Sequence, residues 1–369
     1  MNVTLIACVF VAYLIKKNRF YALPESAAAM IVGMCFGLIA KLASRTKEDL
    51  AFLQFNPEIF FFVLLPPIIF EAGYTLKKAH FFKNVVVIVA YALFGTLIST
   101  FIVGGLTYFL ATSGLVTSIS ATNPMESLLF GALISAVDPV ATLSIMGSPE
   151  LQCDQLLYSL VFGESVLNDA IALVLFKTFS KYYDPDSADL HGSDIPGAFI
   201  QFILVSVGSV IVGVLLGLVC SLMYKHTTLY DYPKFETGLL FLFCYLCYSL
   251  SEAVNLSGIM SLFFHGMILS HYNSYNLSDI SFHTVSQIFS TLACVTETLV
   301  FLYMGMSVFT GAFSHWNPGV TLLLLIFCVV GRAAHIFPLT YLCNLCRPAG
   351  EQIPRKMTVV LWFVGLRGE

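Results

Sequence analysis

Long apolar runs recur along the whole chain, and they constrain its fold more than any other feature. A membrane-spanning helix needs roughly 20 mostly apolar residues, because the bilayer core offers no water to exposed backbone groups. We therefore predict an all-α, polytopic membrane protein over residues 1–369, with no soluble domain. The predicted span cores are 1–15, 22–40, 57–74, 84–110, 127–146, 155–178, 198–224, 235–252, 256–270, 283–309 and 319–343, and a twelfth span begins near Met357.

Composition agrees with lipid as the solvent. Hydrophobic residues make up 58% of the 369 residues and charged residues 11%, whereas soluble domains carry about 25% charge. The formal net charge of −4 argues against a nucleic-acid partner. The CxxC pairs Cys244/Cys247 and Cys343/Cys346 have no further Cys or His group that would complete a zinc site. No cofactor is therefore expected.

Basic residues are distributed unevenly between the loops. Most lysines and arginines follow odd-numbered spans, whereas acids are frequent after even-numbered spans, as in residues 184–194. Cytoplasmic loops of membrane proteins are enriched in Lys and Arg. We therefore predict that the odd loops are cytosolic and that the N-terminus is lumenal or external. The glycosylation sequon Asn2-Val3-Thr4 lies on that predicted outer side.

Ionisable residues within the predicted spans are candidates for function, because a charge in the bilayer core is costly. Acids outnumber bases among them, a balance that favours a path for cations. Glu25, Glu71 and Glu252 could equally be interfacial groups that reach water. The full set is Glu25, Glu71, Asp138, Glu164, Asp169, Glu236, Glu252, Glu297, Arg332 and Arg367.

The predicted span 155–178 has one polar side. With successive residues about 100° apart on a helix, four polar residues fall within about 140° of arc, and the opposite side is apolar. Such a helix must face a water-accessible cavity or a polar partner. Either an ion site or a structural polar cluster would satisfy this requirement. The four residues are Glu164, Ser165, Asn168 and Asp169.

The predicted span 127–146 contains an aspartate beside a proline. Pro139 has no N–H, and its ring crowds the carbonyl of Ser135, four residues earlier. Transporters coordinate small cations near mid-membrane with freed carbonyls of this kind beside a carboxylate such as Asp138. A plain proline kink would have the same sequence signature, so both interpretations stay open.

Two arginines lie in predicted spans near the C-terminal end. A lone Arg332 inside span 319–343 would be very unfavourable, so a carboxylate partner is expected. Arg367 lies between two glycines that favour a helix break. The residues alone pair neither arginine with a particular acid. Pro66-Pro67 is predicted to bend span 57–74 and is interpreted as a packing feature.

Several segments resemble the sodium/proton exchanger family, in the family's order along the chain. The resemblance implies an inverted-repeat cation/proton antiporter fold of about thirteen spans, of which about 11–12 would be present. It also implies a homodimer in which a core domain moves against a dimerisation domain. Two further segments, 21–26 and 336–339, are most similar to the Golgi and endosomal branch. The family-like segments are 64–74, 134–142, 162–170, 256–260 and 365–368.

The resemblance also implies roles for individual residues. Asp169 would bind the transported Na⁺ or K⁺, with Asn168 and Asp138 in the same site. Glu164 and Arg332 would form a supporting ion pair. Pro139 and Arg367 would lie where two broken helices cross. The region linked to amiloride-type inhibitors would contain Phe62, Leu65, Pro66, Pro67, Glu71 and Gly73.

The implied activity is electroneutral exchange of Na⁺ or K⁺ for H⁺, which regulates pH and volume. A Golgi or endosomal membrane is favoured, and the plasma membrane is the alternative. The family pattern normally continues beyond Glu369, so a C-terminally truncated chain is expected. The alternative is a non-transporting subunit that dimerises with full-length exchangers. No nucleophile–base or metal-ligand set accompanies the carboxylates, which disfavours an intramembrane enzyme.

Overall fold

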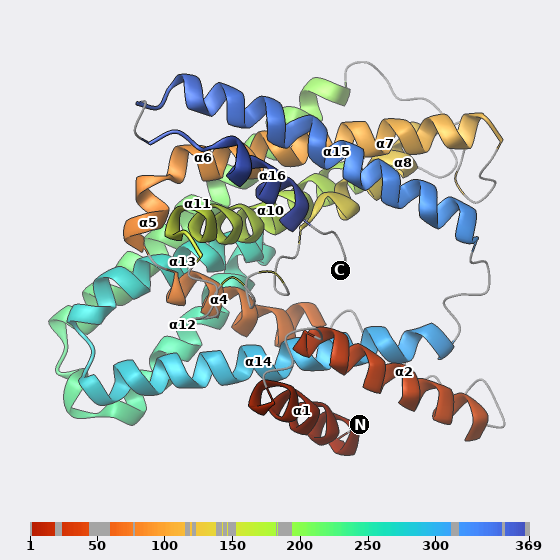
Figure 1. Cartoon of the computed structure of the whole chain (residues 1–369). Coiled ribbons are helices and arrows are strands. Elements are labelled where there is room, and N and C mark those ends of the chain that lie inside the picture. Colours follow the sequence, from red (N-terminus) through yellow and green to blue (C-terminus); the bar gives the residue numbers. More distant parts are fainter. Residues whose placement is uncertain are drawn as a thin grey trace. The chain divides into compact units, whose positions relative to one another are not determined.

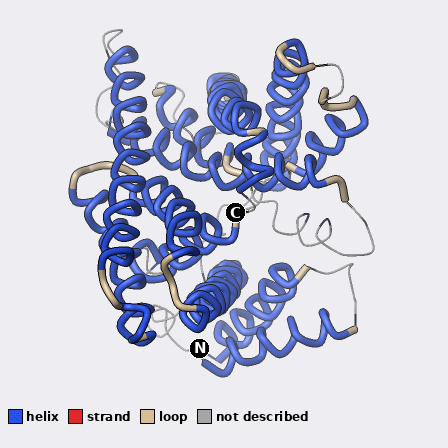
Figure 2. The backbone as a smooth tube through the Cα atoms, turned by 90° about the vertical axis from the view of Figure 1, so that its left-hand side faces the viewer, coloured by secondary structure: helices blue, strands red, loops and turns tan. Residues whose placement is uncertain are grey.

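The structure is a computed structural model that describes residues 2–18, 24–43, 60–76, 78–114, 119, 123–137, 142, 146, 153–181, 183, 194–310, 317–348 and 351–365. These residues form helices joined by turns and loops, and no strand occurs among them (Figure 2). The prediction of an all-α chain is therefore confirmed for this part of the protein.

The chain divides into two compact units. Unit 1 comprises Met1–Thr75, Val214–Tyr248 and Leu262–Trp316, and unit 2 comprises Leu76–Gly213, Ser249–Ser261 and Asn317–Glu369. Three helices belong partly to each unit: α11 (Asp194–His226), α12 (Pro233–Ala253) and α13 (Gly258–Tyr272). Each unit is thus assembled from segments that are far apart in the sequence.

Unit 1 contains α1 (Asn2–Lys17), α2 (Glu25–Ala43), a π-helix η2 (Phe60–Leu64), α4 (Leu65–Thr75) and α14 (Asp279–Thr310). Helices α2 and α14 approach closely because glycines lie at their contact. A Cβ added at Gly37 would lie 2.8 Å from the Met306 carbonyl oxygen. Small residues let membrane helices approach in this way.

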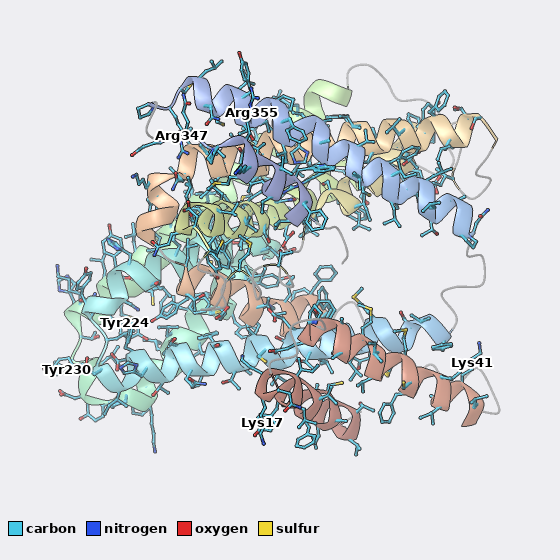
Figure 3. The ribbon with its side chains drawn as sticks, in the orientation of Figure 1. Lys17, Lys41, Tyr224, Tyr230, Arg347 and Arg355 are labelled. Atoms are coloured by element: carbon cyan, nitrogen blue, oxygen red, sulfur yellow. The ribbon has the colours of Figure 1, made fainter. Side chains whose placement is uncertain are left out.

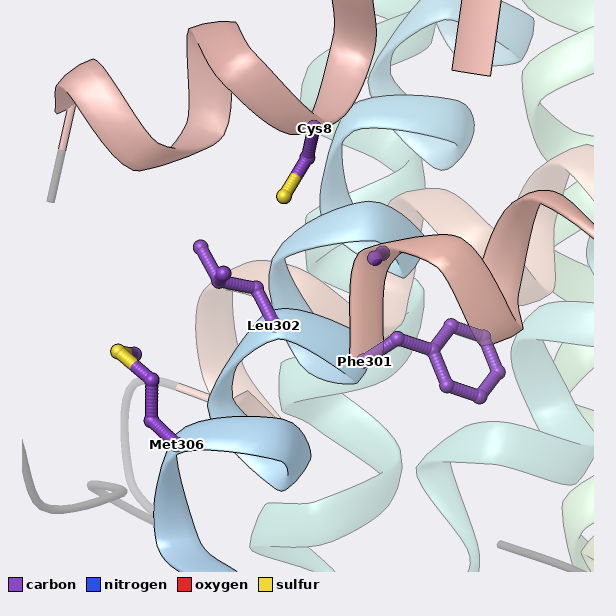
Figure 4. Close-up of a cluster of buried hydrophobic side chains, with 5 residues drawn as sticks. Cys8, Phe301, Leu302 and Met306 are labelled. Atoms are coloured by element: carbon purple, nitrogen blue, oxygen red, sulfur yellow. The ribbon is translucent and has the colours of Figure 1, made fainter. Parts of the chain in front are cut away.

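A hydrophobic cluster joins α1, α2 and α14 within unit 1 (Figure 4). Leu302 is fully buried at its centre, and Cys8 is buried as a small apolar side chain. A buried free cysteine commonly acts as a small hydrophobe of this kind. The members are Cys8, Ala29, Phe301, Leu302 and Met306.

Unit 2 is built around α10, which packs against several of its other helices (Figure 1). The segment from α6 to α7 is continuous but contains a π-helical stretch, η3. Asn123 and Asn317 accept hydrogen bonds from the backbone N–H of Met125 (2.9 Å) and Gly319 (3.1 Å) at the starts of α8 and α15, the usual role of an N-cap asparagine. The helices are α5 (Lys78–Lys83), α6 (Val85–Val89), η3 (Ala90–Gly95), α7 (Thr96–Thr112), α8 (Pro124–Ser135), α10 (Gln155–Lys181), α15 (Pro318–Leu345) and α16 (Arg355–Val364).

The observed helices follow the predicted spans closely. Six helices of the described residues are long and apolar enough to cross a bilayer, and Phe60–Thr75 and Pro124–Ser135 are shorter apolar helices. The largest difference concerns span 127–146, because α8 ends at Ser135 and residues 138–141 lie outside the described part. The short helix α5 was not predicted. The labelled basic residues Lys17, Lys41, Arg347 and Arg355 lie at or beside helix ends (Figure 3), where long side chains can reach water.

Candidate ion-binding site

The polar side of α10 is buried within unit 2. Glu164 is 2% exposed and Asn168 3%, and Ser165 is also buried. Asp169 differs from them because the residue is only half-buried, although its Oδ1 atom is buried. The helix therefore carries two carboxylates in unequal surroundings, one fully enclosed and the other accessible in part.

Glu164 is neutralised by Arg332 of α15. Both carboxylate oxygens accept from the guanidinium: Oε2 lies 3.1 Å from Nη2, and Oε1 contacts Nη1 more closely. Both side chains are almost completely buried. A fork of two parallel hydrogen bonds is the strongest form of this ion pair. The charge of Glu164 is thus matched inside the protein.

Arg332 also contacts the end of α16. Its Nη2 donates to the carbonyl oxygen of Leu361, at 3.1 Å. This carbonyl belongs to the last turn of α16, where backbone oxygens have no partner within the helix. Gly365 follows directly, and a Cβ there would collide with the guanidinium. Glycine at this position therefore lets the end of α16 lie against Arg332.

Asn168 is linked to α7 by Thr96. The Thr96 hydroxyl lies 3.2 Å from Asn168 Oδ1 and also contacts the Ala92 carbonyl, so it can donate to either oxygen. Thr96 directly follows the π-helix η3. Thr96 was not among the predicted site residues, although it forms a polar i, i+4 pair with Thr100 inside the predicted span 84–110.

The end of α8 reaches the same face of α7. Thr100 donates to the Ser135 hydroxyl, at 3.2 Å. Thr96 and Thr100 are one helical turn apart, which places their partners Asn168 and Ser135 roughly 6 Å apart along α7. Helix α8 stops at Ser135, and Ala136 has non-helical backbone angles. The negative end of a helix therefore lies near the polar face of α10.

Three other predicted site residues, Asp138, Pro139 and Arg367, lie outside the described residues. The break expected at Pro139 falls just after the observed end of α8. Among the described residues, no group of three or more His, Cys, Asp or Glu side chains could hold a metal ion. Oxygen-bearing groups that could contact a small cation in the described part of unit 2 include those of Asp169, Asn168 and the Thr96 hydroxyl.

Several other in-span acids have structural surroundings. Glu236 is fully buried in unit 1, where it accepts from the backbone N–H (3.1 Å) and hydroxyl (2.7 Å) of Ser278 at the start of α14. In unit 2, Glu252 pairs with Lys177 at 2.8 Å and accepts from the Gly258 N–H at 3.0 Å. Glu25 is exposed, 3.8 Å from Lys16. These acids cap helices or pair with lysines.

The predicted inhibitor region lies in unit 1, on η2 and α4. Pro67 cannot donate to the Val63 carbonyl, and the Tyr245 hydroxyl supplies a donor to that oxygen at 3.2 Å. A Cβ added to Gly73 would collide with the Phe263 carbonyl. Pro66 and Pro67 are buried, Leu65 and Glu71 are half-buried, and Phe62 is 54% exposed. These residues and the polar face of α10 thus belong to different units.

Comparison with known proteins places this geometry in a family. Residues 5–369 match the model described as sodium/hydrogen exchanger, transmembrane. The chain is 40% identical to sodium/hydrogen exchanger 8 of Homo sapiens, over 98% of this chain and 61% of that protein. It is 37% identical to sodium/hydrogen exchanger 5 of Arabidopsis thaliana, over 96% of this chain and 67% of that protein. The chain thus spans about three fifths of the length of the first relative.

The fold has a counterpart among solved structures. The sodium proton antiporter MjNhaP1 from Methanocaldococcus jannaschii superposes with a TM-score of 0.74 at 18% identity, covering 100% of this chain and 81% of that one. This likeness establishes the antiporter fold, and the family match covers nearly the whole sequence. The chain is therefore a multi-pass integral membrane protein that belongs to the sodium/hydrogen exchanger family.

Proposed function

We propose that this chain exchanges Na⁺ for H⁺ across a membrane, with Asp169 as the carboxylate that binds either ion. The observation that carries the proposal is the contrast on α10. Glu164 is fully buried and matched by Arg332, whereas Asp169 is half-buried on the same polar side. The family match and the exchanger names of the relatives support the same activity.

The mechanism follows from competition at one carboxylate. Asp169 can hold a proton or a sodium ion, but not both well, so occupancy by one ion displaces the other. Exchange is coupled if the protein reorients only when the site is occupied. Asn168 adds a neutral oxygen within hydrogen-bond distance of the Thr96 hydroxyl, and the end of α8 adds partial negative charge. The adjacent pair at the site, Asn168 and Asp169, holds one carboxylate and one neutral amide. This favours one-for-one, electroneutral exchange.

Several finer features belong to the same proposal. Asp138, Pro139 and Arg367 would complete the site where α8 and α16 end. The transported cation is Na⁺, with K⁺ as the alternative, and the protein would work as a homodimer. The likeness to exchanger 8 favours a Golgi or endosomal membrane, where exchange would regulate lumenal pH and volume. Residues of η2 and α4 would form the region that binds amiloride-type inhibitors.

The test is proton flux in sealed vesicles that contain the 369-residue chain, driven by a Na⁺ or K⁺ gradient. We expect flux in the unaltered protein and none in Asp169→Asn, which removes the charge and keeps the size. Glu25→Gln is the matched control, because it removes an exposed carboxylate from another predicted span. We expect this variant to transport normally.

Two outcomes would contradict the proposal. Flux that persists in Asp169→Asn would assign ion binding to another group. A folded chain without flux would instead favour a non-transporting subunit, and co-purification with a full-length exchanger would support that role. Comparing the Na⁺ and K⁺ gradients decides which cation is carried.

A further inference from the structure

His335 is a buried histidine one turn beyond Arg332 on α15. It is 2% exposed, so its ring nitrogens must find their hydrogen-bond partners inside the protein. Its ring packs against Gly95, the last residue of the π-helix η3, where an added Cβ would lie 3.0 Å from the ring atom Cδ2. A glycine at position 95 thus provides the space that the imidazole occupies.

The contacts of His335 define its protonation and tautomer. Nδ1 lies 2.9 Å from the Gly331 carbonyl oxygen, which can only accept, so Nδ1 carries a hydrogen. Nε2 lies 3.3 Å from Nη1 of Arg332, which can only donate, so Nε2 must accept through its lone pair. A doubly protonated ring could not make both hydrogen bonds. The geometry therefore requires a neutral imidazole.

This contact occupies the last N–H of the two terminal nitrogens of the guanidinium. Nη1 and Nη2 of Arg332 together carry four N–H groups. Two of them bind Glu164, one binds Leu361 on the Nη2 side, and the remaining one faces His335 on the Nη1 side. The two outer acceptors lie on opposite edges of the guanidinium group, so together they fix its plane about the axis toward Glu164.

We propose that His335 is a positioning residue of the ion site, acting through Arg332. By accepting from Nη1, it orients the guanidinium so that Nη2 caps the carbonyl end of α16 while the fork to Glu164 is kept. The end of α16 is thereby held beside α10, which carries Asn168 and Asp169. The inference rests on the proposed function, because it assigns His335 an effect on binding of the transported cation.

The test compares three substitutions that differ in reach. His335→Leu fills the space without an acceptor. His335→Gln places an amide oxygen near the position of Nε2, and His335→Asn is too short to reach Arg332. The measured quantity is the Na⁺ concentration that gives half of the Na⁺-induced rise in melting temperature, with the apparent KM and maximal rate of flux measured in vesicles.

We expect the half-saturating Na⁺ concentration and the KM to rise about 3- to 10-fold in His335→Leu and His335→Asn. The maximal rate should stay within about twofold, and His335→Gln should restore both constants. Unchanged Na⁺ constants in His335→Asn, or a His335→Gln protein as impaired as His335→Asn, would overturn the inference. This pair decides the question even where His335→Leu does not fold.

Failure of this inference can be told apart from failure of the proposed function. Asp169→Asn tests the proposed function, because it should abolish both the flux and the Na⁺-induced rise in melting temperature. A protein in which Asp169→Asn abolishes both effects, but His335→Asn changes neither constant, retains its ion site and excludes a positioning role for His335.

Discussion

Two buried glutamates show how differently this membrane protein accommodates a carboxylate. Glu164 in unit 2 faces a guanidinium, and Glu236 in unit 1 faces the start of α14. Both are almost inaccessible. The first carboxylate is matched by a full positive charge, and the second by the N–H and hydroxyl of Ser278 at the positive end of a helix dipole.

The difference indicates which carboxylate belongs to the ion site. Arg332 connects Glu164 to α16 through Leu361, so this ion pair joins helices around the polar face of α10. Glu236 of α12 instead accepts a hydrogen bond from Ser278 at the start of α14. Its backbone carbonyl accepts from the Tyr224 hydroxyl of α11 at 2.5 Å. Burial and charge alone do not distinguish the two residues, but their partners do. We therefore expect Glu164 to affect both stability and ion binding, and Glu236 to affect stability only.

Removing the guanidinium should have the largest effect on stability. Arg332→Met leaves Glu164 charged and buried without a partner, which should lower the free energy of unfolding by about 3–5 kcal/mol. The measurement is unfolding of the purified protein in detergent. The double variant Glu164→Gln/Arg332→Met should recover part of this loss, because no unmatched charge remains. A double variant as unstable as Arg332→Met would show that packing of the arginine matters more than charge.

Removing the charge of Glu236 should have a smaller effect. Glu236→Gln keeps an acceptor for Ser278 but loses the favourable interaction of a charge with the start of α14, at a cost of about 1–2 kcal/mol. The melting temperature should fall accordingly. The half-saturating Na⁺ concentration should not change, because the residue lies in unit 1. A shift of this concentration similar to that of an ion-site variant would remove the proposed distinction between the two glutamates.

Removing the hydroxyl of Thr96 should affect the ion site of unit 2 with a smaller loss of stability than the glutamate and arginine variants. Thr96→Val keeps the shape but loses the hydrogen bond to Asn168, which should destabilise the protein by about 1 kcal/mol. Since Asn168 loses the group that orients it, the half-saturating Na⁺ concentration should rise about two- to fivefold. Thr96→Ser retains the hydroxyl and serves as the control. Equal Na⁺ constants in the Val and Ser variants would exclude a role for Thr96 in orienting the site.

The sequence predicted the helices much better than the contacts between them. Apolar runs place α10 and α15 within a few residues of their observed ends, because length in a bilayer is a local property. The partner of Arg332 could not be derived from the residues alone, and only the family resemblance proposed Glu164. The hydrogen bond from Thr96 to Asn168 and the packing of His335 against Gly95 join segments far apart in the chain, so a local pattern cannot identify these contacts. The π-helix η3 likewise has no proline or cap that predicts it.

Breaking a partly exposed ion pair should lower the stability less than any of the changes at the buried glutamates. Lys177 and Glu252 lie 2.8 Å apart, with side chains 45% and 25% exposed, so water screens their attraction. Lys177→Met should therefore cost less than about 1 kcal/mol, and that cost should diminish at high salt. Glu252→Ala should cost more than Lys177→Met, because Glu252 also accepts from the Gly258 N–H at the start of α13.

Melting temperatures of the two variants at low and high salt separate these contributions. The effect of Lys177→Met should vanish with salt, whereas that of Glu252→Ala should persist in part, since a backbone hydrogen bond at a helix start is screened less than a partly exposed ion pair. Equal losses in both variants at every salt concentration would mean that the ion pair, and not the helix start, accounts for the role of Glu252. In that case Glu252 would differ in kind from Glu236, whose contribution rests on the start of α14.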